Sequence, residues 1–282
     1  MRRTLVPRRQ RGALAVLLAL LAPAGAIGDT LTPPSGAWEY LQRQFYGDHS
    51  IGVVDETFMR LDIQSSTPDP SVTPLTLHFG EAALGHIKKI RVIIDNNPSP
   101  LAATFDLTAD ARISDIGIRV RIDRFTSVRA IAETDGGRLE MRSNWVNASG
   151  GCSTAPSAVT GGVLGDIRFR NSPDGKSLQI AIRHPNYSGF QIDPRTGEPI
   201  PPHYVALVLI KAAGRAIMTA DTGISLSENP SLRIVSDRSL PTPVTVDVVD
   251  SAKAHFSARW LGGGTDGEGS GAVVGAAVGG NR

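Results

Sequence analysis

The chain has 282 residues, of which 41% are hydrophobic and 20% are charged, and its formal net charge is +2. This composition supports one large domain or two ordinary ones and excludes wholesale disorder. The single cysteine excludes an intramolecular disulfide framework, a cysteine-based zinc site and an iron–sulfur cluster.

Residues 1–26 have the pattern of an export signal. Five arginines lie among the first twelve residues, the run 13–22 is apolar, and Ala24-Gly25-Ala26 fits the small-residue rule for cleavage. We predict cleavage after Ala26. An uncleaved anchor is the alternative, but the apolar run is well short of the roughly twenty residues that cross a bilayer. Two Arg-Arg pairs are also a feature of twin-arginine export signals, but the polar–Arg–Arg–x–apolar–apolar pattern of such signals does not surround them.

The charge of the remaining chain excludes two classes of partner. Without the five signal arginines the formal charge changes from +2 to −3. A protein so close to neutral lacks the electrostatic footprint that binds nucleic acid or an anionic membrane surface. We therefore expect no nucleic acid partner and no membrane insertion after cleavage.

The segment 27–49 begins with a loose stretch rich in Pro and Thr and continues into a short helix. Trp38, Leu41 and Phe45 recur at helical spacing, which predicts an amphipathic helix from about residue 37 to residue 45 that caps a sheet. Beyond it the hydrophobic period changes to two, and turn residues at 95–100 and 135–137 separate the alternating runs. These features predict an antiparallel sandwich over 50–148. Its expected strands are 58–63, 75–79, 90–94, 116–123 and 139–146.

Residues 149–165 interrupt the strand pattern and carry no charge. A stretch rich in Gly, Ser and Ala cannot bury enough side-chain surface to order itself, so we predict a flexible linker. Strand patterns resume over 166–261 and predict a second all-β domain, followed by a disordered tail over 262–282. The expected strands of the second domain are 177–182, 204–210, 216–218, 232–235, 244–249 and 256–260.

The sequence contains no pattern that predicts a cofactor, a metal site or a catalytic residue. Gly262, Gly264 and Gly267 satisfy G-x-G-x-x-G, but more glycine follows where a nucleotide site requires a helix, so they are interpreted as part of the tail. The six histidines lack metal-ligand spacing, so only the fold could assemble a metal site from them. No G-x-S-x-G elbow indicates a serine hydrolase.

Cys152 is the residue with the most informative surroundings. It lies between glycines and Ser-Thr-Ala-Pro, which predicts an exposed thiol, and no Lys, Arg or His within nine residues lowers its pKa from about 8.5. This argues against a self-activated nucleophile. It favours an unreactive thiol on a mobile arm, which other proteins load and unload. An incidental linker cysteine, or one that forms a disulfide-linked dimer with a second copy, remains open at this point.

Several motifs resemble the SoxY–SoxZ sulfur carrier of periplasmic thiosulfate oxidation, with both subunits joined in one chain. The resemblance covers about residues 50–260. In the first domain it lies in the turn 93–102, in the hairpin 128–136 and in Gly150-Gly151-Cys152, which match the start of a GGCGG arm. In the second domain it lies in 184–189, 199–204 and 228–230.

The resemblance implies two immunoglobulin-like β-sandwiches and no enzymatic activity of the protein's own. It makes Cys152 the residue that carries sulfur covalently and Gly150 and Gly151 the hinge of its arm. Two features depart from the family: Ser153-Thr154 replaces the second Gly-Gly, and the arm is a loop tied at both ends rather than a chain terminus.

The function implied is that of an exported carrier that presents Cys152 to periplasmic enzymes of sulfur oxidation. The fused form also resembles carriers associated with quinoprotein alcohol dehydrogenases. The alternative function is therefore an accessory or binding module of such a periplasmic system, in which the thiol is not essential.

The export signal leads to a direct prediction. Protein purified from its native host should begin at Ile27, because signal peptidase cuts after a small-residue motif such as Ala24-Gly25-Ala26. Sequencing of the mature N-terminus checks this. Full-length chain recovered from the cytoplasm would contradict export.

Overall fold

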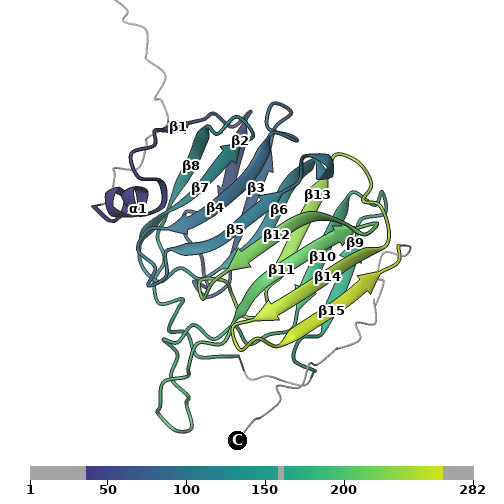
Figure 1. Cartoon of the computed structure of the whole chain (residues 1–282). Coiled ribbons are helices and arrows are strands. Elements are labelled where there is room, and N and C mark those ends of the chain that lie inside the picture. Colours follow the sequence, from purple (N-terminus) through teal and green to yellow (C-terminus); the bar gives the residue numbers. More distant parts are fainter. Residues whose placement is uncertain (1–35, 158–161, 263–282) are drawn as a thin grey trace, which may run out of the picture. The chain divides into compact units, whose positions relative to one another are not determined.

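The computed structural model describes residues 36–157 and 162–262. The predicted signal 1–26, the loose segment up to residue 35, residues 158–161 of the predicted linker and the predicted tail from residue 263 lie outside the described residues. In the described part nearly all regular structure is β, and no helix there is long and apolar enough to span a bilayer (Figure 1).

Among its described residues, the first half of the chain forms one helix, α1 (Gly36–Tyr46), and eight strands around one short 3-10 turn (Ala109–Ala111). The helix matches the predicted one to within a residue at each end. The strands are β1 (Ile51–Val53), β2 (Met59–Ile63), β3 (Thr73–Phe79), β4 (Ile87–Ile94), β5 (Leu101–Leu107), β6 (Ile113–Val120), β7 (Thr126–Thr134) and β8 (Leu139–Val146).

The second half forms seven strands and no helix among its described residues. They are β9 (Ile167–Asn171), β10 (Ser177–Ile182), β11 (Val205–Ala212), β12 (Arg215–Thr222), β13 (Ser231–Ser236), β14 (Val244–Asp250) and β15 (His255–Trp260).

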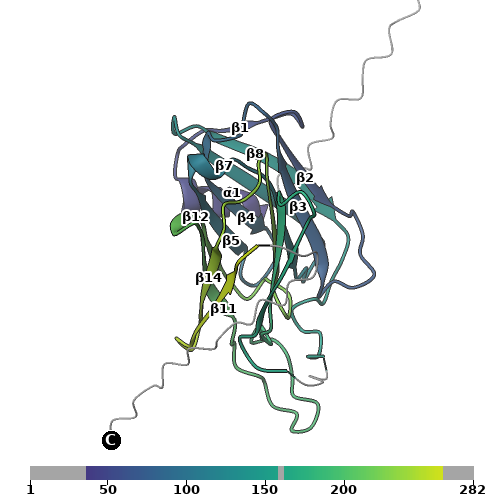
Figure 2. The same ribbon diagram turned by 90° about the vertical axis from the view of Figure 1, so that its right-hand side faces the viewer.

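Both halves have the same strand order. In the first half β2-β3-β6 form one layer and β8-β7-β4-β5 the other; in the second half β9-β10-β13 and β15-β14-β11-β12 do the same. All these pairs are antiparallel. Three strands facing four in this order make an immunoglobulin-like sandwich. The structure thus confirms the predicted all-β fold of two such sandwiches, and Figure 2 shows the two layers.

The two sandwiches join edge to edge in both layers. β5 pairs with β12, with Phe105 opposite Ala220, and β6 pairs with β13, with Ile116 opposite Ile234. These ladders produce one sheet of nine strands and one of six, each running through both halves (Figure 1). Because corresponding strands pair antiparallel, an approximate two-fold axis relates the halves.

One hydrophobic core lies between the two sheets and crosses the junction. Inward-facing residues alternate with outward-facing ones along β3, β10 and β14, which gives each strand one apolar face. The buried residues of this core come from both halves without a break, from Met59 to Trp260. Neither sandwich therefore has a core that is separate from the other's.

Helix α1 covers the outer face of the nine-stranded sheet. Trp38, Leu41 and Tyr46 pack against Ile93 and Ile131, which form a second small apolar cluster. The helix therefore caps a sheet, as its amphipathic pattern indicates.

A buried ion pair fixes the contact between the helix and the sheet. The Arg129 guanidinium lies 4.3 Å from the centre of the Trp38 ring, and its Nη2 donates to Asp95 Oδ2 over 2.8 Å. Both partners of the ion pair are buried. Such a desolvated pair is sensitive to the loss of either partner.

Two long strands were missing from those expected on hydrophobic alternation. β7 is buried on both faces, since α1 and the core lie on opposite sides of it, and so its residues show no period of two. β5 follows directly on the predicted turn 95–100, and its adjacent residues Ala102 and Ala103 are both buried, which interrupts the alternation. The short strands β1 and β9 were also not predicted.

The shared core predicts joint unfolding of the two halves. Phe105→Ala should lower the free energy of unfolding by about 3–5 kcal/mol, because it removes a buried ring on a strand of the junction. Urea unfolding followed by circular dichroism should give one transition before and after the change. Phe125→Ala is the matched control: its ring is 57% exposed, and it should change stability by less than about 0.5 kcal/mol. Two separate transitions in the parent protein would contradict the shared core.

Candidate functional site

The segment that carries Cys152 leaves β8 and turns back against the loop that follows β6. Gly150 N–H donates to Asp123 O over 2.8 Å, and Gly151 N–H donates to Ile122 O over 2.9 Å. Gly150 has φ of +84°, a left-handed conformation that glycine adopts without strain. We call residues 150–157 the arm.

Gly151 lies where no larger residue fits. A Cβ atom there would be 2.2 Å from Pro70 O and 2.7 Å from Ile122 O, and both are backbone atoms that cannot rotate away. The second glycine of the arm is therefore required for close packing in this position. The two predicted hinge glycines are held here by backbone contacts.

The second half of the chain holds the arm from the other side. Ser188 Oγ donates to Cys152 O, and Gln191 Nε2 donates to Thr154 O over 3.1 Å. Further along, Glu228 Oε2 accepts from Ser157 N over 3.0 Å. The arm thus lies between the two sandwiches and contacts both.

Arg121 is a buried cation beneath the arm. Its side chain donates to three backbone carbonyls, each over 3.2 Å: Nε to Leu226 O, Nη1 to Gly151 O and Nη2 to Asn186 O. These acceptors belong to the arm and to two loops of the second half, so one side chain connects all three. Burial lowers the pKa of Arg121, and neighbouring Cys152 opposes that effect.

The prediction that Cys152 is exposed is wrong for this structure. The residue is completely buried. Burial, and then the charge of nearby Asp123, raise the pKa of its thiol from 9.0 to about 12, while Arg121 acts in the opposite direction. The local sequence suggested exposure because it is small and polar. The enclosing groups come from distant segments and could not be seen in it.

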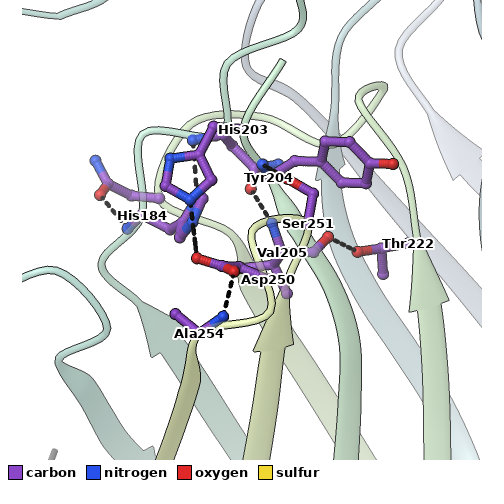
Figure 3. A network of polar contacts seen from close by, with 10 residues as sticks. His184, His203, Tyr204, Val205, Thr222, Asp250, Ser251 and Ala254 are labelled. Atoms are coloured by element: carbon purple, nitrogen blue, oxygen red, sulfur yellow. Dashed lines mark hydrogen bonds and ion pairs between the residues drawn. The ribbon is translucent and has the colours of Figure 1, made fainter. Parts of the chain in front are cut away.

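The fold also assembles a polar cluster that histidine spacing did not predict. His184 and His203 lie with their rings 4.6 Å apart beside Asp250, and His203 Nε2 is 2.8 Å from Asp250 Oδ2 (Figure 3). Asp250 also accepts from Ala254 N over 2.8 Å. Although burial opposes its ionisation, the hydrogen bonds from His203 and Ala254 lower the pKa of Asp250. The cluster is a buried carboxylate stabilised by hydrogen bonds.

The hydrogen bonds of His184 determine what the cluster can do. Its Nδ1 accepts from Asn186 N over 3.0 Å, which assigns the ring proton to Nε2, 3.6 Å from Asp250 Oδ2. Burial, and then His203, lower the pKa of His184 to about 4, so the ring is neutral. A neutral ring with its proton on Nε2 offers no lone pair to a cation beside Asp250. The arrangement instead fixes the loop at Asn186, whose carbonyl accepts from Arg121.

Asn97 connects the turn 95–100, through hydrogen bonds, to the loop that carries Arg121. Its Nδ2 donates to Arg121 O over 2.7 Å and to Ser225 Oγ over 3.0 Å, and its Oδ1 accepts from Asp123 N. Asn97 and Asn186 come from motifs in different halves of the chain. Two of the motifs that carried the family resemblance, the turn 93–102 and the segment 184–189, therefore meet beside the arm.

Comparison with protein families assigns both halves. The family described as sulfur oxidation protein SoxY matches residues 42–152, and the family described as sulphur oxidation protein SoxZ matches residues 168–260. The chain is a fused SoxY–SoxZ protein. The SoxY match ends at Cys152, so the arm lies at the boundary of the SoxY domain.

Among solved structures, the sulfur carrier protein SoxY from Chlorobium limicola f thiosulfatophilum is 16% identical, with a TM-score of 0.33. The match covers 39% of this chain and 89% of that chain. No curated protein matches the sequence.

The packing of Gly151 leads to a prediction about the thiol. Gly151→Ala should expel the arm and raise the rate of Cys152 alkylation by iodoacetamide at pH 8 roughly tenfold or more, because an added methyl group cannot fit between two backbone carbonyls. Intact mass spectrometry over time measures the rate. Ser153→Ala is the matched control: the residue is exposed, its hydroxyl makes only a solvent-exposed hydrogen bond to Gly150 O, and its loss should change the rate little. A parent thiol that reacts as fast as a free peptide cysteine would contradict the buried position.

Proposed function

We propose that this SoxY–SoxZ protein is a non-catalytic carrier of sulfur oxidation that binds its cargo covalently through Cys152. The observation that carries the proposal is the end of the SoxY match at Cys152, on an arm held by residues of both domains. The arm begins with two glycines, which permit a change of backbone direction.

The buried thiol is consistent with a carrier only if the arm moves. With a pKa of about 12 the closed thiol is almost wholly protonated at neutral pH, and the thiolate is the reactive form. We infer that loading and unloading take place on an open arm. The contacts to be broken are single hydrogen bonds to backbone atoms, each worth about 0.5–1.5 kcal/mol in water.

We further propose that the carrier works after export to the periplasm and that its partners are enzymes that act on the bound sulfur. The predicted signal over 1–26 and the near-neutral charge of the remaining chain support this placement. A disulfide-linked dimer through Cys152 stays a prediction that would also require the open arm.

A second candidate is an accessory module for a periplasmic quinoprotein dehydrogenase system. The burial of Cys152 and the replacement of the second Gly-Gly by Ser153-Thr154 favour it, because both reduce access to the sulfur. In that case the thiol has no essential role.

Mass spectrometry of protein from the native host separates the two candidates. A carrier should show one or more sulfur atoms added at Cys152, removable by a reducing agent, and Cys152→Ser should abolish function with export and folding intact. Ser153→Ala is the control that preserves the thiol. An unmodified Cys152 together with full function of Cys152→Ser would contradict the carrier and support the accessory module.

A further inference from the structure

The contacts that hold the arm closed all engage its backbone. Arg121, Ser188 and Gln191 bind the carbonyl oxygens of residues 151, 152 and 154, and none of the hydrogen bonds among the described residues ends on the cysteine sulfur. Closure therefore does not depend on a bond to the side chain. It depends on whether the side chain fits its surroundings.

Those surroundings suit a small, uncharged group. Cys152 has no exposed surface, so atoms added to its sulfur must displace protein atoms or move the arm. The charged groups that face it are Asp123, from the loop after β6, and Arg121. Arg121 also faces Glu228 and Asp69, and its side chain is already bound to three carbonyls. Burial and Asp123 together disfavour negative charge on the sulfur more than Arg121 favours it.

We propose that the closed site favours a small, neutral group over a charged one, so that attachment of an anionic group to Cys152 drives the arm out. The proposal deepens the proposed carrier function and rests on it for its biological meaning. The empty carrier then hides its thiol between the two domains, and the loaded carrier exposes its cargo to partner enzymes. The state of the sulfur selects the position of the arm.

The raised pKa of the thiol points in the same direction. Ionisation of the sulfur favours the open arm over the closed one, because the charged form is disfavoured in the buried position. The same linkage gives a pH dependence: closure is unaffected below pH 9, where the thiol is neutral in both positions, and weakens as the pH rises from 9 towards 12. A thiolate can avoid the free-energy cost of a buried charge by taking up a proton, but a group with a permanent negative charge cannot.

Synthetic adducts test the proposal without the natural cargo. At a pH above 9, the Cys152 thiolate of the full chain attacks the sulfenyl sulfur of a methanethiosulfonate reagent. The new Cys–S–S bond forms as the reagent's S–S bond breaks, methanesulfinate leaves with the electron pair, and the thiol proton goes to solvent. One reagent adds a 2-sulfonatoethylthio group and a second adds a neutral 2-hydroxyethylthio group to the cysteine sulfur.

Hydrogen–deuterium exchange of the arm measures its position, because the amides of Gly150 and Gly151 are hydrogen-bonded only when it is closed. In the unmodified protein and in Cys152→Ala these amides should exchange slowly. The sulfonate adduct should accelerate their exchange roughly tenfold or more, because burying a permanent charge without a partner is strongly disfavoured. The neutral adduct should accelerate it less.

Two results would overturn the proposal. Equal protection in the sulfonate adduct and the free thiol would show that the site accepts a charged load. Equal acceleration by the two adducts would show that size alone opens the arm. The outcome is independent of whether Cys152 carries sulfur in the host, so failure of the carrier function and failure of this switch are distinguishable.

Discussion

Backbone pairing between β5 and β12, and between β6 and β13, is the constraint on which the site depends. These two ladders align the sandwiches so that the loop after β6 lies beside the loop before β13. The loop after β6 supplies Arg121 and Asp123, and the second half supplies Asn186 and Ser188. Neither half alone could enclose the arm, because its contacts are divided between the two.

The buried charge of Arg121 is stabilised by hydrogen bonds to carbonyl dipoles. Three carbonyls surround it, and each belongs to a segment that would be mobile without a partner. The cost of removing a guanidinium from water is offset only while all three segments are in place. Because of Arg121, each of these three segments is held in a fixed conformation only while the other two are. His184 accepts from Asn186 N and lies beside Asp250, and so it extends this dependence to the end of β14.

The fold was largely predictable because period-two patterns and turn residues depend on local sequence. β8 and β10 were predicted at their observed bounds, and the all-β class followed from such strands. Strand β7 was not, since burial on both faces removes the alternation that reveals a strand. The position of Cys152 could not be predicted either. Small polar neighbours describe the segment, whereas the enclosing groups, such as Pro70 and Ser188, are far away in sequence.

The covalent connection between the two domains has a consequence for assembly. Two separate chains that meet through these sheet edges would be in equilibrium with their free subunits, and dilution would separate them. In one polypeptide the second domain is present at a fixed, high effective concentration near the first. The protein therefore keeps its strict one-to-one pairing of domains at any expression level. No unpaired β5 or β12 edge is left available for aggregation.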